Sequence, residues 1–160
     1  MVDDDMMADM YDYIKCELKK NDYIHYEISN FAKSGYESKH NLKYWDLDDY
    51  IGVGLGASGL LDNTRYDNTT DFKTYFKSFR DNSYNLTIED RKNEFMMLGL
   101  RKIEGIRISK YKELFNSDPF SDFEAINKLI EKKLLVVKND NIKIPDDKLF
   151  LANLVWSEFV

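Results

Sequence analysis

A histidine and a tyrosine stand four positions apart in the segment His40-Asn41-Leu42-Lys43-Tyr44. In a helix this spacing would place both side chains on the same face. An imidazole nitrogen can ligate iron, and a phenol beside it can steady that ligand or replace it. On spacing alone, a lone histidine in a polar segment is more often an ordinary surface residue. The pair becomes a candidate metal site only if other residues support it.

A second candidate is the run Gly52-x-Gly54-x-Gly56, which Ala57 and Ser58 follow. We predict a strand over residues 50–61 with one face free of side chains, so that a ligand or another backbone can approach closely. The run is not the dinucleotide fingerprint, which needs G-x-G-x-x-G between a strand and a helix. Tight packing of the strand is the commoner reason for such glycines.

A third candidate comprises Glu27 and Asn30, which lie where a predicted strand over 23–28 meets the following loop. In α/β barrels ligand sites are built at that edge, so both side chains are candidates for a substrate-side loop. A solvated polar strand face is an equally good explanation. Alternation predicts Ile24 and Tyr26 on one face of this strand and Glu27 on the other.

Composition excludes several classes of protein. The formal net charge of −6 provides no overall positive field, so we do not expect a nucleic-acid partner. The only cysteine, Cys16, excludes an intrachain disulfide and any multi-cysteine iron–sulfur or zinc site within this chain. We find no signal-peptide pattern and no apolar run of roughly 18 residues, so we expect a cytoplasmic protein.

The elements that would position these residues change character near residue 82. Before it, a helix from about Met6 to Lys19, the strand over 23–28, an irregular stretch over 29–49 and a short helix over 71–79 are typical of α/β structure. We therefore divide the chain into domains 1–82 and 83–160.

The second domain is predicted to be mainly helical. Thr87 and Asp90 form a capping-box pattern, and further helices are predicted from Ser109 and Pro119. Two short strands over 134–137 and 142–144 and a closing helix over 147–159 complete a winged-helix-like outline. DNA binding is disfavoured because acidic residues interrupt the positive stripe of a DNA-reading helix.

Several blocks of sequence, in order and at consistent spacing, resemble one family. The first blocks are Tyr26-Glu27-Ile28-Ser29-Asn30-Phe31-Ala32, Gly35-Tyr36-Glu37-Ser38-x-His40-Asn41-x-x-Tyr44-Trp45, Tyr50-Ile51-Gly52-x-Gly54-x-Gly56-Ala57 and Arg65-Tyr66-x-Asn68. Later blocks are Leu86-Thr87 through Glu94, Met97-Leu98-Gly99-Leu100-Arg101 and Glu104-Gly105. Together they resemble the oxygen-independent coproporphyrinogen III oxidase-like family of radical S-adenosylmethionine proteins.

The resemblance implies a fold of the α+β or α/β class. Residues 1–82 are expected to be the C-terminal remnant of a partial (β/α) barrel, and residues 83–160 the family's helical, winged-helix-like C-terminal domain. In the family, a CxxxCxxC loop in the other half of the barrel holds a [4Fe–4S] cluster that cleaves S-adenosylmethionine. We expect that Met1 is not the natural start and that this part alone performs no radical chemistry, with no catalytic residue of its own.

Two activities are attached to the family. One branch binds haem and transfers it to haem-accepting proteins, and the HNxxY motif marks that branch. The resemblance thus implies that His40 ligates haem iron, with Asn41 and Tyr44 in the same haem-binding motif. The alternative is the true oxidase, which oxidatively decarboxylates coproporphyrinogen III. We favour the chaperone, because porphyrinogen chemistry needs no axial imidazole.

Two further expectations follow from the resemblance. In the oxidase, the equivalent of the glycine strand ends beside S-adenosylmethionine, which would place Gly56, Ala57 and Ser58 near that cofactor. The strand over 23–28 would be a cut barrel edge with unpaired backbone groups, so we expect some tendency to form a dimer through it.

Overall fold

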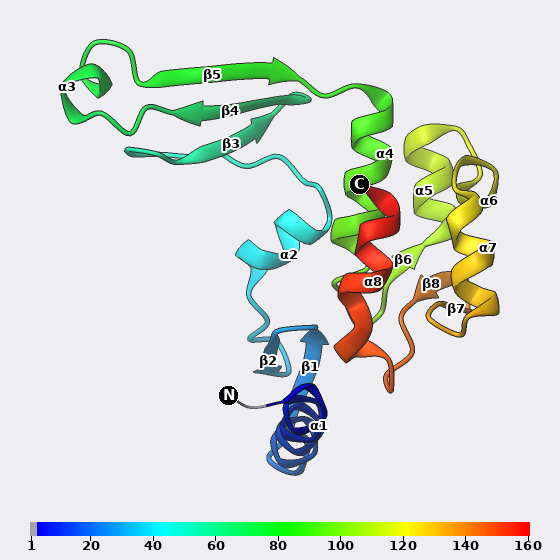
Figure 1. Ribbon diagram of the computed structural model, residues 1–160. Helices are drawn as coiled ribbons and strands as arrows, with labels where there is room; N and C mark the ends of the chain where they lie inside the picture. The colour runs from blue at the N-terminus through cyan, green and yellow to red at the C-terminus, as the bar shows by residue number, and fades with distance from the viewer. Residues whose placement is uncertain (1–2) are drawn as a thin grey trace.

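The computed structural model describes residues 3–160 and shows a mixed α/β chain in which an N-terminal helix and hairpin, a central short helix, a three-stranded arm and a helical C-terminal part follow one another (Figure 1). The elements of the first half are α1 (Asp4–Lys20), β1 (Tyr23–Glu27), β2 (Asn30–Lys33), α2 (Lys39–Trp45), β3 (Ser58–Leu61), β4 (Thr64–Asn68), α3 (Phe72–Tyr75) and β5 (Arg80–Asn85).

The elements of the second half are α4 (Ile88–Gly99), β6 (Ile106–Arg107), α5 (Ile108–Phe115), α6 (Pro119–Asp122), α7 (Glu124–Glu131), β7 (Val136–Lys138), β8 (Asn141–Lys143), η1 (Leu149–Leu151), α8 (Ala152–Trp156) and η2 (Ser157–Phe159). Sheets of two and three strands connect these elements: β1-β2, β3-β4-β5 and β6-β8-β7, all antiparallel.

Helix α1 confirms the predicted N-terminal helix. Its first turn is capped by Asp3, whose carboxylate accepts a hydrogen bond from the Met6 N–H at 2.8 Å. The strand that follows ends at Glu27, close to its predicted end. The stretch predicted as irregular over 29–49 instead contains β2 and α2, because the chain turns back after Glu27 and pairs with β1 through contacts such as His25 with Phe31.

The polar face of β1 is covered, so it is not the solvated strand face considered above. Glu27 is completely buried, whereas Ile24 remains 46% exposed. The polar face is covered because Tyr11 of α1 lies over it and donates a hydrogen bond to the Ile28 carbonyl at 2.9 Å. Alternation places side chains on two faces, but which face is covered depends on elements distant in sequence.

The arm of β3, β4 and β5 extends away from the helical part, with α3 at its tip (Figure 1). The predicted strand over 50–61 is wrong for most of its length. Residues 51–57 form a loop in which Gly54 and Gly56 have φ values of +104° and +64°, and left-handed backbone of this kind does not continue a strand. Only Tyr50, through a bridge to Leu60, and residues 58–61 pair as strand.

An ion pair fastens the arm to the helical part. Both guanidinium nitrogens of Arg65 on β4 donate to the Glu94 carboxylate on α4, at 2.5 and 2.9 Å. Two buried leucines, Leu60 and Leu86, extend the core to the base of the arm. Toward the tip the arm exposes Phe72 and Phe76.

The helical part confirms the predicted capping box. Thr87 and Asp90 exchange side-chain and backbone hydrogen bonds at the start of α4. The prediction that Ser109 begins the next helix is wrong by one residue, because α5 begins at Ile108. The Ser109 hydroxyl does not cap this helix and instead donates to Asp140 at 2.6 Å. The helix predicted from Pro119 is interrupted at Phe123, whose extended backbone separates α6 from α7.

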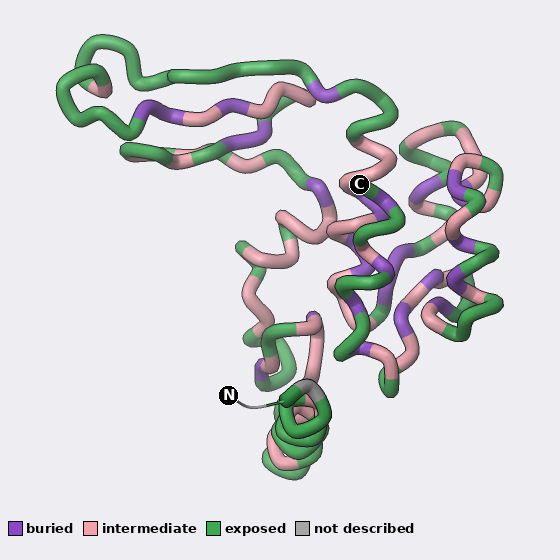
Figure 2. Tube along the Cα trace, viewed as in Figure 1, coloured by how far each residue is buried: buried purple, intermediate pink, exposed green. Residues whose placement is uncertain are grey.

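The closing helix is a short α-helix, α8, between two 3-10 turns rather than one continuous helix over 147–159. Within it Val155 is buried, whereas Leu154 is exposed, so these two neighbours do not share the inward face. Figure 2 shows that burial is densest in the helical part and sparse along α1. Among residues 3–160, none of the helices combines the length and apolar character needed to cross a bilayer.

Candidate functional site

Helix α2 carries the histidine–tyrosine pair and places both rings on one face, with His40 exposed and Tyr44 half-buried. The helix begins at Lys39 because the Ser38 hydroxyl accepts the Asn41 N–H at 3.3 Å. The ring centroids of His40 and Tyr44 lie 4.8 Å apart at an interplanar angle of 85°. This edge-to-face geometry is a favourable aromatic arrangement. The structure therefore brings together the pair that the spacing predicted.

The aromatic contacts continue beyond α2. The ring of Tyr44 also meets that of Tyr50, with centroids 4.4 Å apart and an angle of 61°. His40, Tyr44 and Tyr50 thus form an aromatic ladder from α2 to the base of the arm. Sequence reasoning missed Tyr50, because it lies outside α2 and no helical spacing relates it to the motif.

The exposed imidazole of His40 is free to bind a ligand. Within residues 3–160 no hydrogen bond to its ring nitrogens is found, and no cluster of three or more His, Cys, Asp or Glu side chains able to hold a metal ion occurs. In haem the porphyrin supplies four nitrogen ligands to the iron, so a single axial ligand from the protein can complete the attachment to the metal. A single accessible imidazole therefore fits haem better than a free metal ion.

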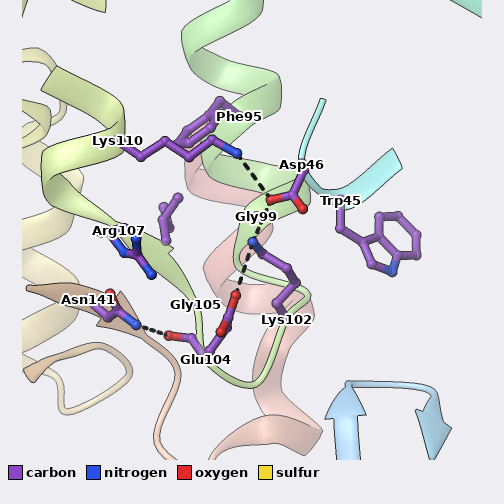
Figure 3. A pocket seen from close by; sticks show the side chains of 11 residues that line it. Trp45, Asp46, Phe95, Gly99, Lys102, Glu104, Gly105, Arg107, Lys110 and Asn141 are labelled. Carbon is purple, nitrogen blue, oxygen red and sulfur yellow. Dashed lines mark hydrogen bonds and ion pairs between the residues drawn. The ribbon is translucent and has the colours of Figure 1, made fainter. Parts of the chain in front are cut away.

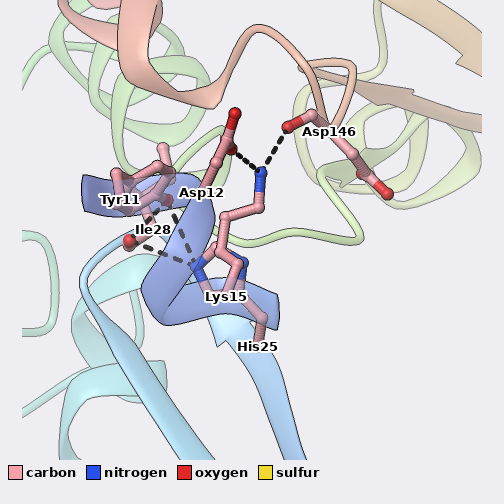
Figure 4. A network of polar contacts seen from close by, with 6 residues as sticks. All are labelled: Tyr11, Asp12, Lys15, His25, Ile28 and Asp146. Atoms are coloured by element: carbon pink, nitrogen blue, oxygen red, sulfur yellow. Dashed lines mark hydrogen bonds and ion pairs between the residues drawn. The ribbon is translucent and has the colours of Figure 1, made fainter. Parts of the chain in front are cut away.

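The other histidine, His25, is engaged in a half-buried network of polar contacts with α1 (Figure 4). The His25 Nε2 atom lies 3.2 Å from the Ile28 carbonyl and 3.4 Å from the Tyr11 hydroxyl, and its ring stacks on Phe31 at 4.2 Å. Burial lowers the pKa of His25, and burial together with Glu27 raises the pKa of Tyr11 to about 12. His25 therefore serves the packing of the hairpin, which leaves His40 as the available imidazole.

Contacts at the C-terminal end of α2 fix the helix to the rest of the chain. The Arg101 guanidinium lies between the rings of Trp45 and Trp156, 4.4 and 4.5 Å from their centroids. The Lys102 ammonium contacts the Asp46 carboxylate at 2.6 Å. Helix α2 is thus tied to the end of α4 and to α8.

Beside this end of α2 lies a polar cavity of about 220 Å³ (Figure 3). Its charged groups are largely paired with one another: Lys110 lies 3.5 Å from the same Asp46 oxygen that Lys102 contacts, and the Lys102 ammonium lies 3.5 Å from Glu104. Asn141 donates to the Glu104 carbonyl at 3.0 Å. The charged residues that line this cavity therefore mainly hold α2 in place.

Hydrogen bonds with Tyr66 and Asn68, from the Arg65-Tyr66-x-Asn68 block, hold the glycine loop over 51–57. The Gly52 N–H donates to the Tyr66 hydroxyl at 3.0 Å, and the buried Asn68 amide donates to the carbonyls of Gly54 and Gly52 at 2.9 and 3.3 Å. The two sequence blocks thus form one local structure. The spacing of the two blocks in the sequence did not predict this, because the hydrogen bonds join β4 to the loop.

The three residues predicted near S-adenosylmethionine lie at the end of this loop. The Gly56 N–H donates to the Thr69 carbonyl at 3.0 Å, and the Ala57 carbonyl accepts the Asn68 N–H at 2.9 Å. The Ser58 hydroxyl donates to Asp67 at 2.5 Å. Several of their polar groups are therefore already used within the arm, and their proximity to a cofactor stays a prediction.

The predicted substrate-side residues, Glu27 and Asn30, lie together, but Glu27 is buried whereas Asn30 is exposed. The Asn30 amide donates to one carboxylate oxygen of Glu27. The other oxygen, Oε2, is buried and has no hydrogen-bond partner among the described residues. The backbone N–H of Ile28, the residue after Glu27, donates to the Arg101 carbonyl at 3.0 Å. No hydrogen bond or aromatic contact within residues 3–160 joins this pair to His40.

Comparison with known proteins identifies the family. Residues 86–148 match the family model described as "HemN C-terminal domain". Over 98% of its length, the chain is 40% identical to the "Heme chaperone HemW" of Lactococcus lactis. The chain belongs to the HemN-like family. This family is the one that the ordered sequence blocks resemble.

Other HemN-like relatives support the same assignment. The "Heme chaperone HemW" of Bacillus subtilis is 34% identical over 96% of the chain. The solved structure "Coproporphyrinogen III oxidase (HemN) from Escherichia coli is a Radical SAM enzyme" aligns with a TM-score of 0.73 over 94% of the chain, at 15% identity, which supports the fold alone. The chain spans 43% and 42% of the two chaperones' lengths and 40% of the solved chain.

Proposed function

We propose that this HemN-like chain is the part of a haem chaperone that binds haem through His40 and releases it to a haem-accepting protein. The observation that carries the proposal is the exposed, unbonded imidazole of His40, set edge-to-face against Tyr44 within the HNxxY motif. Relatives at 40% and 34% identity are named haem chaperones, which favours this reading over the oxidase.

The exposed position of His40 suits a ligand that is passed on to another protein. Haem iron would bind the imidazole of His40 on an open surface, where an acceptor protein can approach from the opposite side. Tyr44 would steady the imidazole through its edge contact, and Asn41 contributes the backbone N–H that starts the helix. Helix α2 is anchored at its far end by Trp45, so its histidine end can remain accessible.

The alternative is that the complete protein oxidatively decarboxylates coproporphyrinogen III. The solved HemN chain shares this fold, and at 15% identity the likeness does not distinguish the two activities. That chemistry needs a [4Fe–4S] cluster and S-adenosylmethionine, and the only cysteine of this chain is the exposed Cys16. We place both cofactors in the complete protein, with S-adenosylmethionine near Gly56, Ala57 and Ser58, and assign no catalytic residue to this chain.

We also propose the finer fold assignment. Residues 83–160 would be a winged-helix-like domain, which is supported by the element order α4-β6-α5-α6-α7-β7-β8 and the sheet order β6-β8-β7. Residues 1–82 would be the remnant of a partial (β/α) barrel. Strand β5 crosses the proposed boundary and leads directly into α4. A cytoplasmic location is proposed from the single cysteine.

A second copy of this chain is a further proposed partner. One edge of β1 pairs with β2, and the other is partly filled, since the Ile103 N–H donates to the Tyr26 carbonyl and the Ile28 N–H to the Arg101 carbonyl. The open edge is therefore limited to residues 23–25, a shorter edge than the predicted 23–28. We expect weak, concentration-dependent dimers in sedimentation velocity; a single monomeric species at all concentrations would contradict this.

Haem titration of the chain tests the main proposal. We expect saturable binding with a shift of the Soret band for the native chain, and for His40→Ala an affinity at least about tenfold lower, because even outer partners of metal ligands contribute on that scale. Lys43→Ala, on the same helix, is the matched control and should bind like the native chain.

Each other result has a definite meaning. Equal binding by the native chain and His40→Ala would place the haem ligand elsewhere. Failure of the native chain to bind haem would contradict the proposal that these residues suffice.

A further inference from the structure

The motif residues on α2 contact one aromatic ring outside the motif, that of Tyr50. His40 contacts Tyr44, and Tyr44 contacts Tyr50. We propose that Tyr50 is the positioning residue of the haem-binding motif: it fixes the ring of Tyr44 and, through it, the orientation of the His40 imidazole. This inference rests on the proposed haem binding by His40.

Tyr50 is the fixed end of the aromatic ladder. Its backbone N–H donates to the Leu60 carbonyl at 2.7 Å, and its carbonyl accepts the Leu60 N–H at 3.0 Å. Leu60 is itself buried in the core.

Helix α2 needs such a support. It has only seven residues, and none of them is buried; helices this short are marginal without tertiary contacts. Its C-terminal end is held by Trp45 and Asp46. His40 lies more than a turn away from both, so the aromatic ladder is the contact that can set its orientation.

A fixed imidazole matters for iron. Groups that orient a metal-binding histidine tune both affinity and the geometry of the ligand. Here the orienting contact is an edge-to-face ring rather than a hydrogen bond. Without Tyr50, Tyr44 loses its neighbour and the imidazole can adopt several orientations, which lowers affinity and mixes the ligation states of the iron.

The test compares ferric haem binding by the native chain, Tyr50→Leu and Tyr50→Phe. Tyr13→Leu is the control, because Tyr13 is exposed on α1 and lies outside the ladder. Affinity is measured from the Soret band, and the iron ligation by electron paramagnetic resonance. Circular dichroism checks that each variant is folded.

We expect Tyr50→Leu to bind haem about three- to tenfold more weakly, the scale of a lost aromatic pair, and to give a mixture of iron spectra. Tyr50→Phe keeps the ring and should retain the native affinity and a single spectrum, as should Tyr13→Leu.

Native affinity and an unchanged spectrum for a folded Tyr50→Leu would overturn the inference while leaving haem binding intact. An equal loss in Tyr50→Phe would also overturn it, because the hydroxyl rather than the ring would then be required. If the native chain binds no haem, the proposed function itself fails.

Discussion

Replacement of Arg65 by methionine is expected to loosen the arm from the helical part and to destabilise the chain by about 2–3 kcal/mol, the range for charged hydrogen bonds whose loss leaves a partly buried partner. The guanidinium makes two hydrogen bonds to the Glu94 carboxylate, and the side chains are only 25% and 18% exposed. Methionine keeps the length of the side chain but leaves Glu94 without its cation.

The effect should be large because few other contacts hold the arm. Strand β5 has no buried residue, and the tip around α3 exposes its phenylalanines. Urea unfolding would measure the loss of stability, and hydrogen exchange over residues 58–85 would show whether the arm opens first. We expect faster exchange in the arm than in α4.

A double-mutant cycle separates the ion pair from other effects of the substitution. Glu94→Met alone should be destabilising, whereas the variant with both methionines should be less unstable than the two single effects predict, since no unpaired charge remains. If the two single effects simply add to within about 0.5 kcal/mol, the pair does not act as a unit and the prediction is wrong.

Local signals in the sequence predicted local structure well. The Thr87 and Asp90 pattern predicted a helix start that the structure confirms, because a capping box involves four consecutive residues. Between the two short strands predicted over 134–137 and 142–144, Asn139 and Asp140 form the turn; both residues have positive φ, which asparagine and aspartate tolerate. Such features need no knowledge of distant parts of the chain.

Non-local packing explains most of the failures. Alternation along β1 predicted its two faces but not that α1 would cover the polar one, so the burial of Glu27 was missed. The glycines at 52, 54 and 56 suggested a strand because their φ values cannot be read from sequence. Tyr50 reaches the candidate site because its backbone pairs with that of Leu60. No spacing within the motif indicates this pairing.

The residues of the motif itself were found by resemblance, and their geometry then supplied a reason for the spacing. His40 and Tyr44 share a helix face because they stand one turn apart. The Gly-rich and Arg-Tyr-x-Asn blocks, separate in sequence, meet because β3 and β4 are adjacent strands. Sequence thus identified the blocks, whereas only the fold shows which of them contact one another.

The contact between these blocks predicts a second large effect, at Gly59. Gly59 on β3 lies opposite Tyr66 on β4, and a Cβ atom added to Gly59 would lie 2.2 Å from the Cζ atom of the tyrosine ring. A shift of this buried ring is opposed by the Arg80 guanidinium, 4.1 Å from its centroid, and by the hydrogen bond from the Gly52 N–H to its hydroxyl. Gly59→Ala should therefore cost about 3 kcal/mol, the upper part of the range for overpacking.

The loss should also reach the glycine loop. If Tyr66 is displaced, its hydroxyl no longer accepts the Gly52 N–H, and residues 51–57 should become more sensitive to proteolysis. Thermal unfolding and limited proteolysis measure the two effects. Gly99→Ala is the control and should cost less than Gly59→Ala: the added Cβ would approach only the side chain of Ile106, at 3.0 Å from its Cγ2 atom and 3.8 Å from its Cβ and Cγ1 atoms.

Removal of the tyrosine ring tests the cause directly. In a Tyr66→Ala background the space beside residue 59 is open, so adding Gly59→Ala should cost little further stability, and the two effects should be strongly non-additive. Full additivity would mean that the glycine is required for a reason other than the ring. Non-additivity, with a loop that is already open in Tyr66→Ala alone, would show that Gly59 serves to admit the tyrosine that holds the loop.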